Sequence, residues 1–248
     1  MAPLSLLTVA SASFLFLTKT SGALGTTTYN VTLGTTGKCL SDINDARQAA
    51  GLSDLIQATT ANTLPAGGNL SGTYSQWVWY PVCETLLTKK SVTTIDNSVK
   101  AQFVSGTYAF YLADSDTIDC DPVLKKWKNA YKNFEGMPPT YSEGAPVYKS
   151  DDNVSLIAMY NPSPNATADC RVVTCTKTVD SPSSVDKGYA LMCLTAPDAL
   201  NKKDPQNPPF SQDQWDKIVS AIKGSASGAS PSVVGVVAAV LGFAIMML

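Results

Sequence analysis

The spacing of apolar residues changes along the chain from three- and four-residue steps to alternation. Residues 39–58 mostly follow the first spacing, which predicts one helix, or two short ones separated at Gly51. Residues 77–87 repeat it and predict a second helix with Pro81 in its first turn, where an N–H is not needed. Between these helices, residues 64–73 contain Pro, three Gly and polar residues, which predicts a loop.

Strand signals dominate the second half. Residues 103–112 alternate between apolar and polar positions and predict a strand. The β-rich runs at residues 154–160, 171–178 and 189–195 predict three more. Because the turn-forming residues 179–184 separate the last two runs, we expect these to be neighbouring antiparallel strands.

A third helix is predicted from its start and from its faces. Asp121 can cap it with Pro122 in the first position. Its apolar side chains, Val123, Trp127 and Tyr131, fall on one face and lysines fall on another. The segment is therefore expected to be an amphipathic helix.

The last predicted helix carries signals at both ends. Ser211 and Gln214 form a capping box, Phe210 and Trp215 a hydrophobic staple, and Gly224 is expected to end the helix. Helices come first along the chain, one helix lies centrally and strands dominate late. This order favours an α+β or α/β fold in which helices cover a largely antiparallel sheet.

The start of the chain predicts a secreted protein. Residues 1–23 hold a short apolar core followed by small residues, which is typical of a signal peptide cleaved after Ala23. The mature chain is then expected to begin at residue 24.

The end of the chain predicts a lipid anchor. Small residues follow Lys223, the last charged residue, and residues 233–248 are wholly apolar. This pattern is typical of a glycosylphosphatidylinositol (GPI) attachment signal over residues 224–248, and it disfavours a single-span tail anchor. Residues 24–223 are then expected to form a single ectodomain on the outer leaflet of the plasma membrane. The candidate attachment residues are Gly224, Ser225 and Ala226.

The cysteines and the glycosylation sequons agree with secretion. An even count of six cysteines predicts three disulfides, and the count alone leaves fifteen connectivities open. The cysteines are Cys39, Cys83, Cys120, Cys170, Cys175 and Cys193. Four Asn-x-Ser/Thr sequons predict surface positions. They lie at Asn30, Asn69, Asn153 and Asn165.

The charge balance limits the partners. Removal of Lys19 with the signal peptide leaves a net charge of about −3, and no basic footprint for nucleic acid is expected. Four lysines on the third predicted helix could bind a polyanion such as a sulfated glycan or an anionic lipid head group. The solvent-exposed face of an amphipathic helix explains them as well. They are Lys125, Lys126, Lys128 and Lys132.

Catalytic and metal-binding signals are weak. The chain has no histidine, which removes Ser-His-Asp and Cys-His sites and most zinc sites, and no cofactor is expected. The Ser184-x-x-Lys187 match lies in a Pro/Ser turn without its companion motifs. The acidic run at residues 114–119 departs from an EF-hand, because its sixth position is Asp119 and its twelfth is Lys125.

Four short segments resemble the CAP superfamily of secreted cysteine-rich and pathogenesis-related proteins. Residues 169–175 and 189–197 are similar to its terminal strands, residues 41–47 to its opening helix and residues 127–131 to its Trp-containing helix. The resemblance implies a three-layer α-β-α sandwich and a Cys175–Cys193 bond.

In its whole layout the chain is more similar to the GPI-anchored surface antigens of the coccidian parasite Eimeria. The similarity rests on the Tyr-x-Val-x-Leu start at residues 29–33, the helix at 44–52, Trp77, Val-Cys at 82–83, the six cysteines and the apolar tail. It implies a non-enzymatic antigen that meets host cell surfaces, through a glycan or protein receptor, and host antibodies.

The CAP metal cleft does not transfer to this chain. Ile43 and Ala130 stand where the family has His and Glu, and Val154 or a neighbour stands at the second His. Two rival functions remain on the sequence alone. One is a lipid or small-ligand binder with a CAP-like groove, and the other is an enzyme that uses carboxylates.

Overall fold

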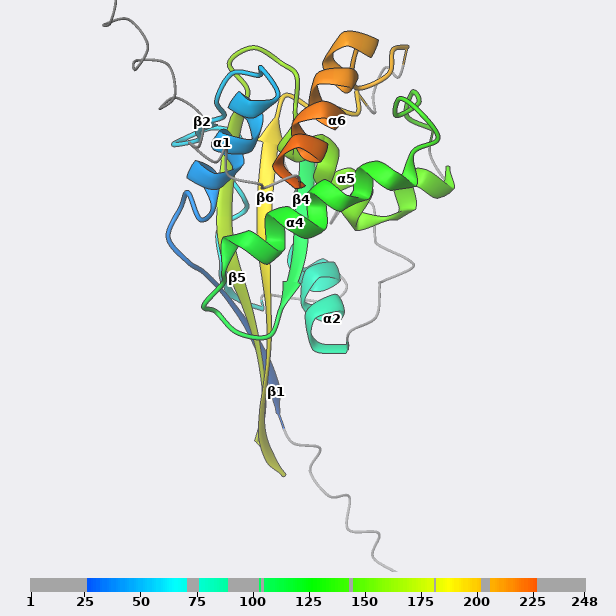
Figure 1. Ribbon diagram of the computed structural model, residues 1–248. Helices are drawn as coiled ribbons and strands as arrows, with labels where there is room; N and C mark the ends of the chain where they lie inside the picture. Colours follow the sequence, from blue (N-terminus) through cyan, green and yellow to red (C-terminus); the bar gives the residue numbers. More distant parts are fainter. Residues whose placement is uncertain are drawn as a thin grey trace, which may run out of the picture.

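The computed structural model describes residues 26–70, 76–88, 103, 105–142, 145–180, 182–201 and 206–226. The predicted signal peptide and the apolar tail lie outside these residues. Within them, helices and a mainly antiparallel sheet form one mixed structure (Figure 1).

The sheet has six strands in the order β3-β1-β5-β6-β4, and β2 pairs with β5 away from this path. All neighbours along the path are antiparallel, whereas β2 is parallel to β5. The largely antiparallel sheet predicted from the sequence is therefore confirmed. The strands are β1 (Thr27–Leu33), β2 (Ile56–Gln57), β3 (Gly68–Asn69), β4 (Thr107–Ala113), β5 (Thr167–Asp180) and β6 (Ser183–Ala196).

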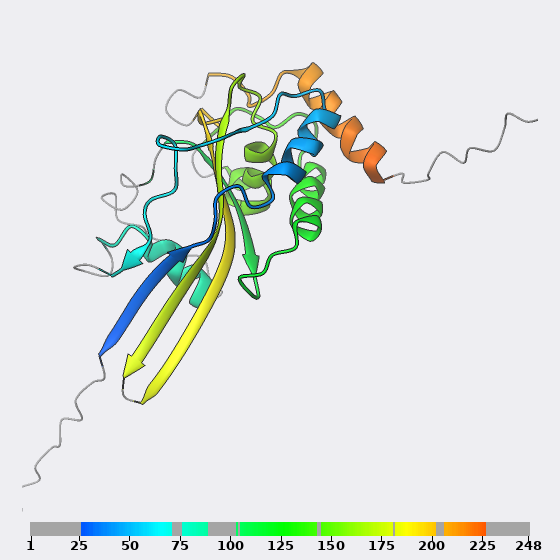
Figure 2. The same cartoon turned by 90° about the vertical axis from the view of Figure 1, so that its left-hand side faces the viewer.

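Most helices cover one face of the sheet. In Figure 2, α1, α4, α5 and α6 lie on one side of the strands and α2 lies on the other. The helices are α1 (Leu40–Ala49), α2 (Tyr80–Thr88), α4 (Cys120–Asn129), α5 (Asp151–Met159) and α6 (Gln212–Ala226), with short 3-10 turns η2 (Ala130–Asn133) and η3 (Pro146–Lys149).

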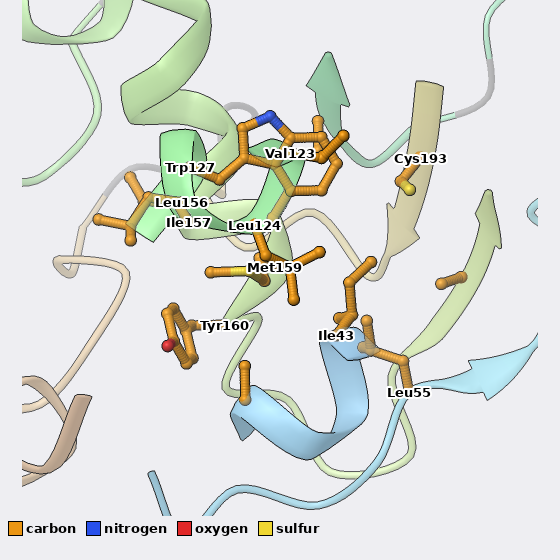
Figure 3. Packing of buried hydrophobic residues seen from close by; sticks show 14 of the residues in the cluster. Ile43, Leu55, Val123, Leu124, Trp127, Leu156, Ile157, Met159, Tyr160 and Cys193 are labelled. Carbon is orange, nitrogen blue, oxygen red and sulfur yellow. The ribbon is translucent and has the colours of Figure 1, made fainter. Parts of the chain in front are cut away.

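Each face of the sheet has its own hydrophobic core. On one face lies the larger core, in which Trp127 of α4 is fully buried in the same cluster as Leu156 of α5 and Ile43 of α1 (Figure 3). The Trp127 indole N–H also donates to the Phe110 carbonyl of β4 at 3.0 Å. On the other face lies the smaller core, in which Trp79 and the α2 residue Leu86 are completely buried. The two cores explain why the central strands are apolar on both sides.

The strand predicted at residues 154–160 is wrong, because this run is the helix α5. Its residues from Leu156 to Tyr160 are all buried, with the helix packed against β4. The Ser155 hydroxyl accepts the Phe110 N–H at 2.9 Å. A short run that is apolar on every side has no period that separates a helix from a strand.

The third predicted helix forms, but its predicted cap, Asp121, is wrong by two residues. Helix α4 begins at Cys120, and its cap is Asp119, whose carboxylate accepts the Asp121 N–H at 3.1 Å. The capping box of α6 is confirmed, because Ser211 N–H donates to the Gln214 side chain at 2.9 Å and Gln214 N–H donates back at 3.3 Å. This helix continues past the expected end at Gly224.

Three disulfides form, but the implied Cys175–Cys193 bond is wrong. The hairpin register places Cys170 opposite Cys193, and these two are bonded. Cys175 pairs in register with Gly188 and faces the opposite side of the sheet, where it is bonded to Cys83 of α2. The third bond joins Cys39 to Cys120, at the starts of α1 and α4.

Candidate recognition surfaces

One part of the sheet projects beyond all helices. It consists of Thr27–Asn30 of β1, Thr176–Asp180 of β5 and Ser183–Lys187 of β6, and we call it the arm (Figure 2). Backbone pairing continues through it, with Thr27 opposite Val179 and Asp180 opposite Ser183. Residues 182–187 are all exposed. The arm is therefore a long, solvated surface held by strand pairing.

The arm contains the Ser184-x-x-Lys187 match. Both residues are exposed on strand β6, and Val185 between them is 58% exposed. The acidic run at residues 114–119 is mostly exposed as well, and Asp119 serves as the cap of α4. Among the residues that the structure describes, no group of three or more His, Cys, Asp or Glu side chains could hold a metal ion.

Several titratable groups have shifted pKa values, and burial is the main cause in each case. Burial lowers the pKa of Arg47 to about 10, an effect partly opposed by Asp54. The Arg47 guanidinium is satisfied by the carbonyls of Ser53 at 2.8 Å and Met159 at 2.9 Å. Burial also raises the pKa of Tyr160 and, with the help of Asp152, that of Asp151.

Arg47 has a structural role in this arrangement. It is only 1% exposed and ties α1 to the end of α5. A buried cation whose donors are taken by backbone carbonyls is not available as an electrophile or a proton donor. Asp169 is equally buried, and its carboxylate is bound by Arg171 at 2.8 Å and by the Leu64 N–H at 2.9 Å.

The four lysines predicted as a polyanion patch have different surroundings. Lys126 forms an ion pair with Asp152 at 3.3 Å and lies over the Tyr111 ring at 5.6 Å. Lys125 is exposed, whereas burial lowers the pKa of the half-buried Lys128. Lys132 is exposed on η2, next to Tyr131. Lys126 is therefore the one of the four that forms an ion pair within the described residues.

A lysine from another helix lies near Lys132. The Tyr131 ring lies 5.8 Å from the Lys132 ammonium and 6.0 Å from that of Lys223 on α6. No local sequence signal could have found Lys223, because only the packing of α6 brings it to the ring.

The four sequons differ in accessibility. The prediction for Asn153 is wrong, since this residue is only 3% exposed and its amide is bound to Asn133 at 2.6 Å and to the Val147 carbonyl at 2.8 Å. Asn69 and Asn165 are exposed. Asn30 is partly buried and donates to the Asn69 side chain across the strands at 2.7 Å.

Three pockets on the described surface are open to solvent, and each is lined by both polar and apolar groups. The first, about 530 Å³, lies between the end of β1 and the loop before α4, with Thr32, Thr35 and Lys38 in its wall. The second, about 600 Å³, lies between α1 and α6. A third, about 340 Å³, is lined by polar residues such as Asn62 and Asn165 and by the apolar Ala196 and Pro197. None of these three is an enclosed apolar cavity of the kind that buries a lipid chain.

Comparison with known proteins gives the family. A family model described as the sporozoite surface antigen (SAG) protein domain matches residues 35–237. The chain belongs to the sporozoite surface antigen family. It is also similar to the sporulated oocyst TA4 antigen of Eimeria tenella, with 27% identity over 258 residues that cover 97% of this chain and 98% of that antigen. No solved structure matches this surface antigen.

Family membership confirms the resemblance to the Eimeria antigens and implies a surface location. The resemblance to the CAP superfamily stays a prediction. None of the helices in the described parts of this surface antigen is long and apolar enough to cross a membrane.

Proposed function

We propose that this surface antigen is a non-enzymatic display domain, held on the outer leaflet by a GPI anchor and used in attachment to host cells. The proposal is supported by the family and by the tail, in which small residues and an apolar terminus follow α6. Gly224, Ser225 and Ala226, the candidate attachment residues, form the end of α6.

The observation that carries the proposal is the position of the two ends of the fold. Figure 2 shows the arm and the C-terminal end of α6 on opposite sides of the molecule. The first described residues, which begin β1, lie at the tip of the arm. A protein anchored after α6 would therefore hold the arm away from its own membrane, where a host surface or an antibody meets it first.

The chemistry of the arm suits a recognition surface. It presents Lys177, Asp186 and Lys187 together with several Thr and Ser hydroxyls, and these groups can bind a polar glycan or a protein receptor. Backbone pairing fixes their spacing, so side chains can vary without loss of a core. Attachment and immune recognition would use the same exposed groups.

An experiment on intact cells tests the proposal. Cells that express the full chain are treated with phosphatidylinositol-specific phospholipase C, and the protein is expected in the supernatant without residues 233–248. Retention on the cells, with these residues detected by mass spectrometry, would refute the anchor.

The attachment role is tested on the same cells. We expect host epithelial cells to bind them, and we expect Lys177→Ser/Asp186→Ser/Lys187→Ser to remove most of this binding. The control Lys149→Ser/Asp213→Ser/Lys217→Ser makes the same change in charge at exposed positions outside the arm. Removal of host glycans separates a glycan receptor from a protein receptor. Equal binding by both variants would exclude the arm.

The rival functions have less support. A lipid binder needs an enclosed apolar cavity, whereas the three pockets described above are open to solvent and partly lined by polar side chains. A CAP-like origin of the fold would be supported by a solved structure of a relative with the same strand order. Stoichiometric zinc, or turnover of a peptide, ester or glycoside by the purified protein, would favour an enzyme instead.

A further inference from the structure

An aromatic ring between two lysines lies beside the end of α6. Tyr131 is on η2, with the ammonium groups of Lys132 at 5.8 Å and Lys223 at 6.0 Å from its ring centre. Lys132 and Lys223 are exposed, and Tyr131 is partly buried. We call these three residues the basic corner. Lys128 stands one helical step before Tyr131 and adds a further cation to this side of α4.

The basic corner is fixed relative to the candidate attachment residues. Helix α6 runs without a break to Ala226, so Lys223 precedes Gly224, Ser225 and Ala226 within one helical segment. At a rise of about 1.5 Å per residue, Lys223 lies about 2–5 Å along the axis from these positions. Trp215, Ile218 and Ile222 bury the inner side of α6 in the larger core, which holds the helix to the body.

An anchor attached at the end of an ordered helix decides which side of the body faces the head groups. Flexible spacers allow a domain to sample many heights, whereas an ordered helix allows few. The side chains nearest to the attachment residues would then be those of the basic corner. Lysine is attracted to lipid phosphate, and tyrosine favours the layer between water and hydrocarbon, because its ring is apolar and its hydroxyl is polar.

We propose that the basic corner docks on the phosphate groups of the phospholipids around the anchor and fixes the domain with its arm pointing outward. This inference rests on the proposed anchor. It assigns Lys132 to the protein's own membrane rather than to a host polyanion, because the corner lies on the side that the anchor turns toward the membrane. Lys126 takes no part, since Asp152 holds it.

The test measures the height and the tilt of the arm. The full anchored protein is purified with its lipid and reconstituted in vesicles of phosphatidylcholine, alone or with phosphatidylinositol. A fluorophore on an unnatural amino acid at position 184 reports its distance from acceptor lipids by energy transfer. We expect one narrow distance population for the wild type, narrower with phosphatidylinositol, and a broadening when added salt screens the charges.

The variant Lys132→Glu/Lys223→Glu is expected to lose the narrow population and to show more energy transfer, because the arm tilts toward the bilayer. Lys149→Glu/Lys217→Glu makes the same change in charge at exposed positions outside the basic corner and outside the arm, and it is expected to match the wild type. Thermal unfolding of both variants checks that each remains folded.

Other outcomes overturn the inference. An unchanged distance population in Lys132→Glu/Lys223→Glu would show that the corner does not dock. If this variant instead lost binding to heparan sulfate at an unchanged arm height, the corner would be a site for host polyanions. Failure of phospholipase C to release the wild type would refute the anchor itself, and this result is separate from both.

Discussion

The two halves of the β5–β6 hairpin have the same backbone pairing but opposite surroundings. In the half within the body, Cys170, Val173, Leu191 and Leu194 are completely buried. In the arm half, residues 182–187 are all exposed, although the register continues without a break. The comparison teaches that strand pairing extends beyond the cores, whereas most of the stabilising burial does not. The body is therefore expected to limit sequence change, and the arm to tolerate it.

The disulfides follow the same division. All three join residues of the body. Cys170–Cys193 links the two strands of the hairpin, and Cys83–Cys175 links α2 to β5. Cys175 is the last residue of β5 before the arm, and its bond to Cys83 holds α2 on the face of the sheet that carries the smaller core. The four predictions that follow concern losses of stability in the body, and two of them use the arm as the comparison.

The largest expected effect comes from removal of a disulfide. Cys39→Ala/Cys120→Ala opens a loop of 81 residues and is expected to lower the free energy of unfolding by about 4.5 kcal/mol. Cys170→Ala/Cys193→Ala opens a loop of 23 residues and is expected to cost about 3.4 kcal/mol. Denaturant unfolding measures both values. Peptide mapping without reduction checks the pairing, and a Cys175–Cys193 peptide would contradict it.

A cavity in the larger core comes next. Trp127 is completely buried, so Trp127→Ala is expected to lower the free energy of unfolding by about 3–5 kcal/mol, because contacts and one hydrogen bond are lost. The truncation Val185→Ala, at an exposed position of the arm, is expected to change the free energy of unfolding by less than about 0.5 kcal/mol. Denaturant unfolding compares the two, and equal losses would mean that the arm contributes like a core.

An alkaline pH is expected to act on the body. Burial raises the pKa of Tyr160, so above pH 10 the unfolded chain releases this proton while the folded chain keeps it. Stability is therefore lost as pH rises, by about 1.4 kcal/mol per pH unit for this group. Tyr160→Phe is expected to remove this part of the slope between pH 10 and 11. An unchanged slope in the variant would contradict the burial of Tyr160.

The smallest expected loss concerns a sequon. Asn153→Ala breaks two hydrogen bonds in the body and is expected to cost about 1 kcal/mol. Ser184→Ala in the arm is the control, with no measurable loss expected. In a host that glycosylates sequons, mass spectrometry is expected to find no glycan on Asn153 in the folded protein. A glycan there would show that this part of the body opens.

The sequence alone predicted the elements that depend on near neighbours. The apolar steps before Gly51, Pro81 in the first turn of α2 and the capping box at Ser211 each involve residues within a few positions, so local chemistry decides them. The hairpin of β5 and β6 belongs here as well, because its turn residues lie between two β-rich runs. The family resemblance also came from the order of such short segments along the chain.

Tertiary structure alone decided which distant residues meet. Residues 155–160 are buried within and just after helix α5, and burial on every side leaves no period in the sequence that separates a helix from a strand. The disulfide pairing depends on the register of the hairpin and on which face α2 covers, and a shift of one residue would turn each cysteine to the other face. Lys223 reaches Tyr131 only because the core holds α6 beside η2. Long-range packing fixed these pairs, and no spacing along the chain records it.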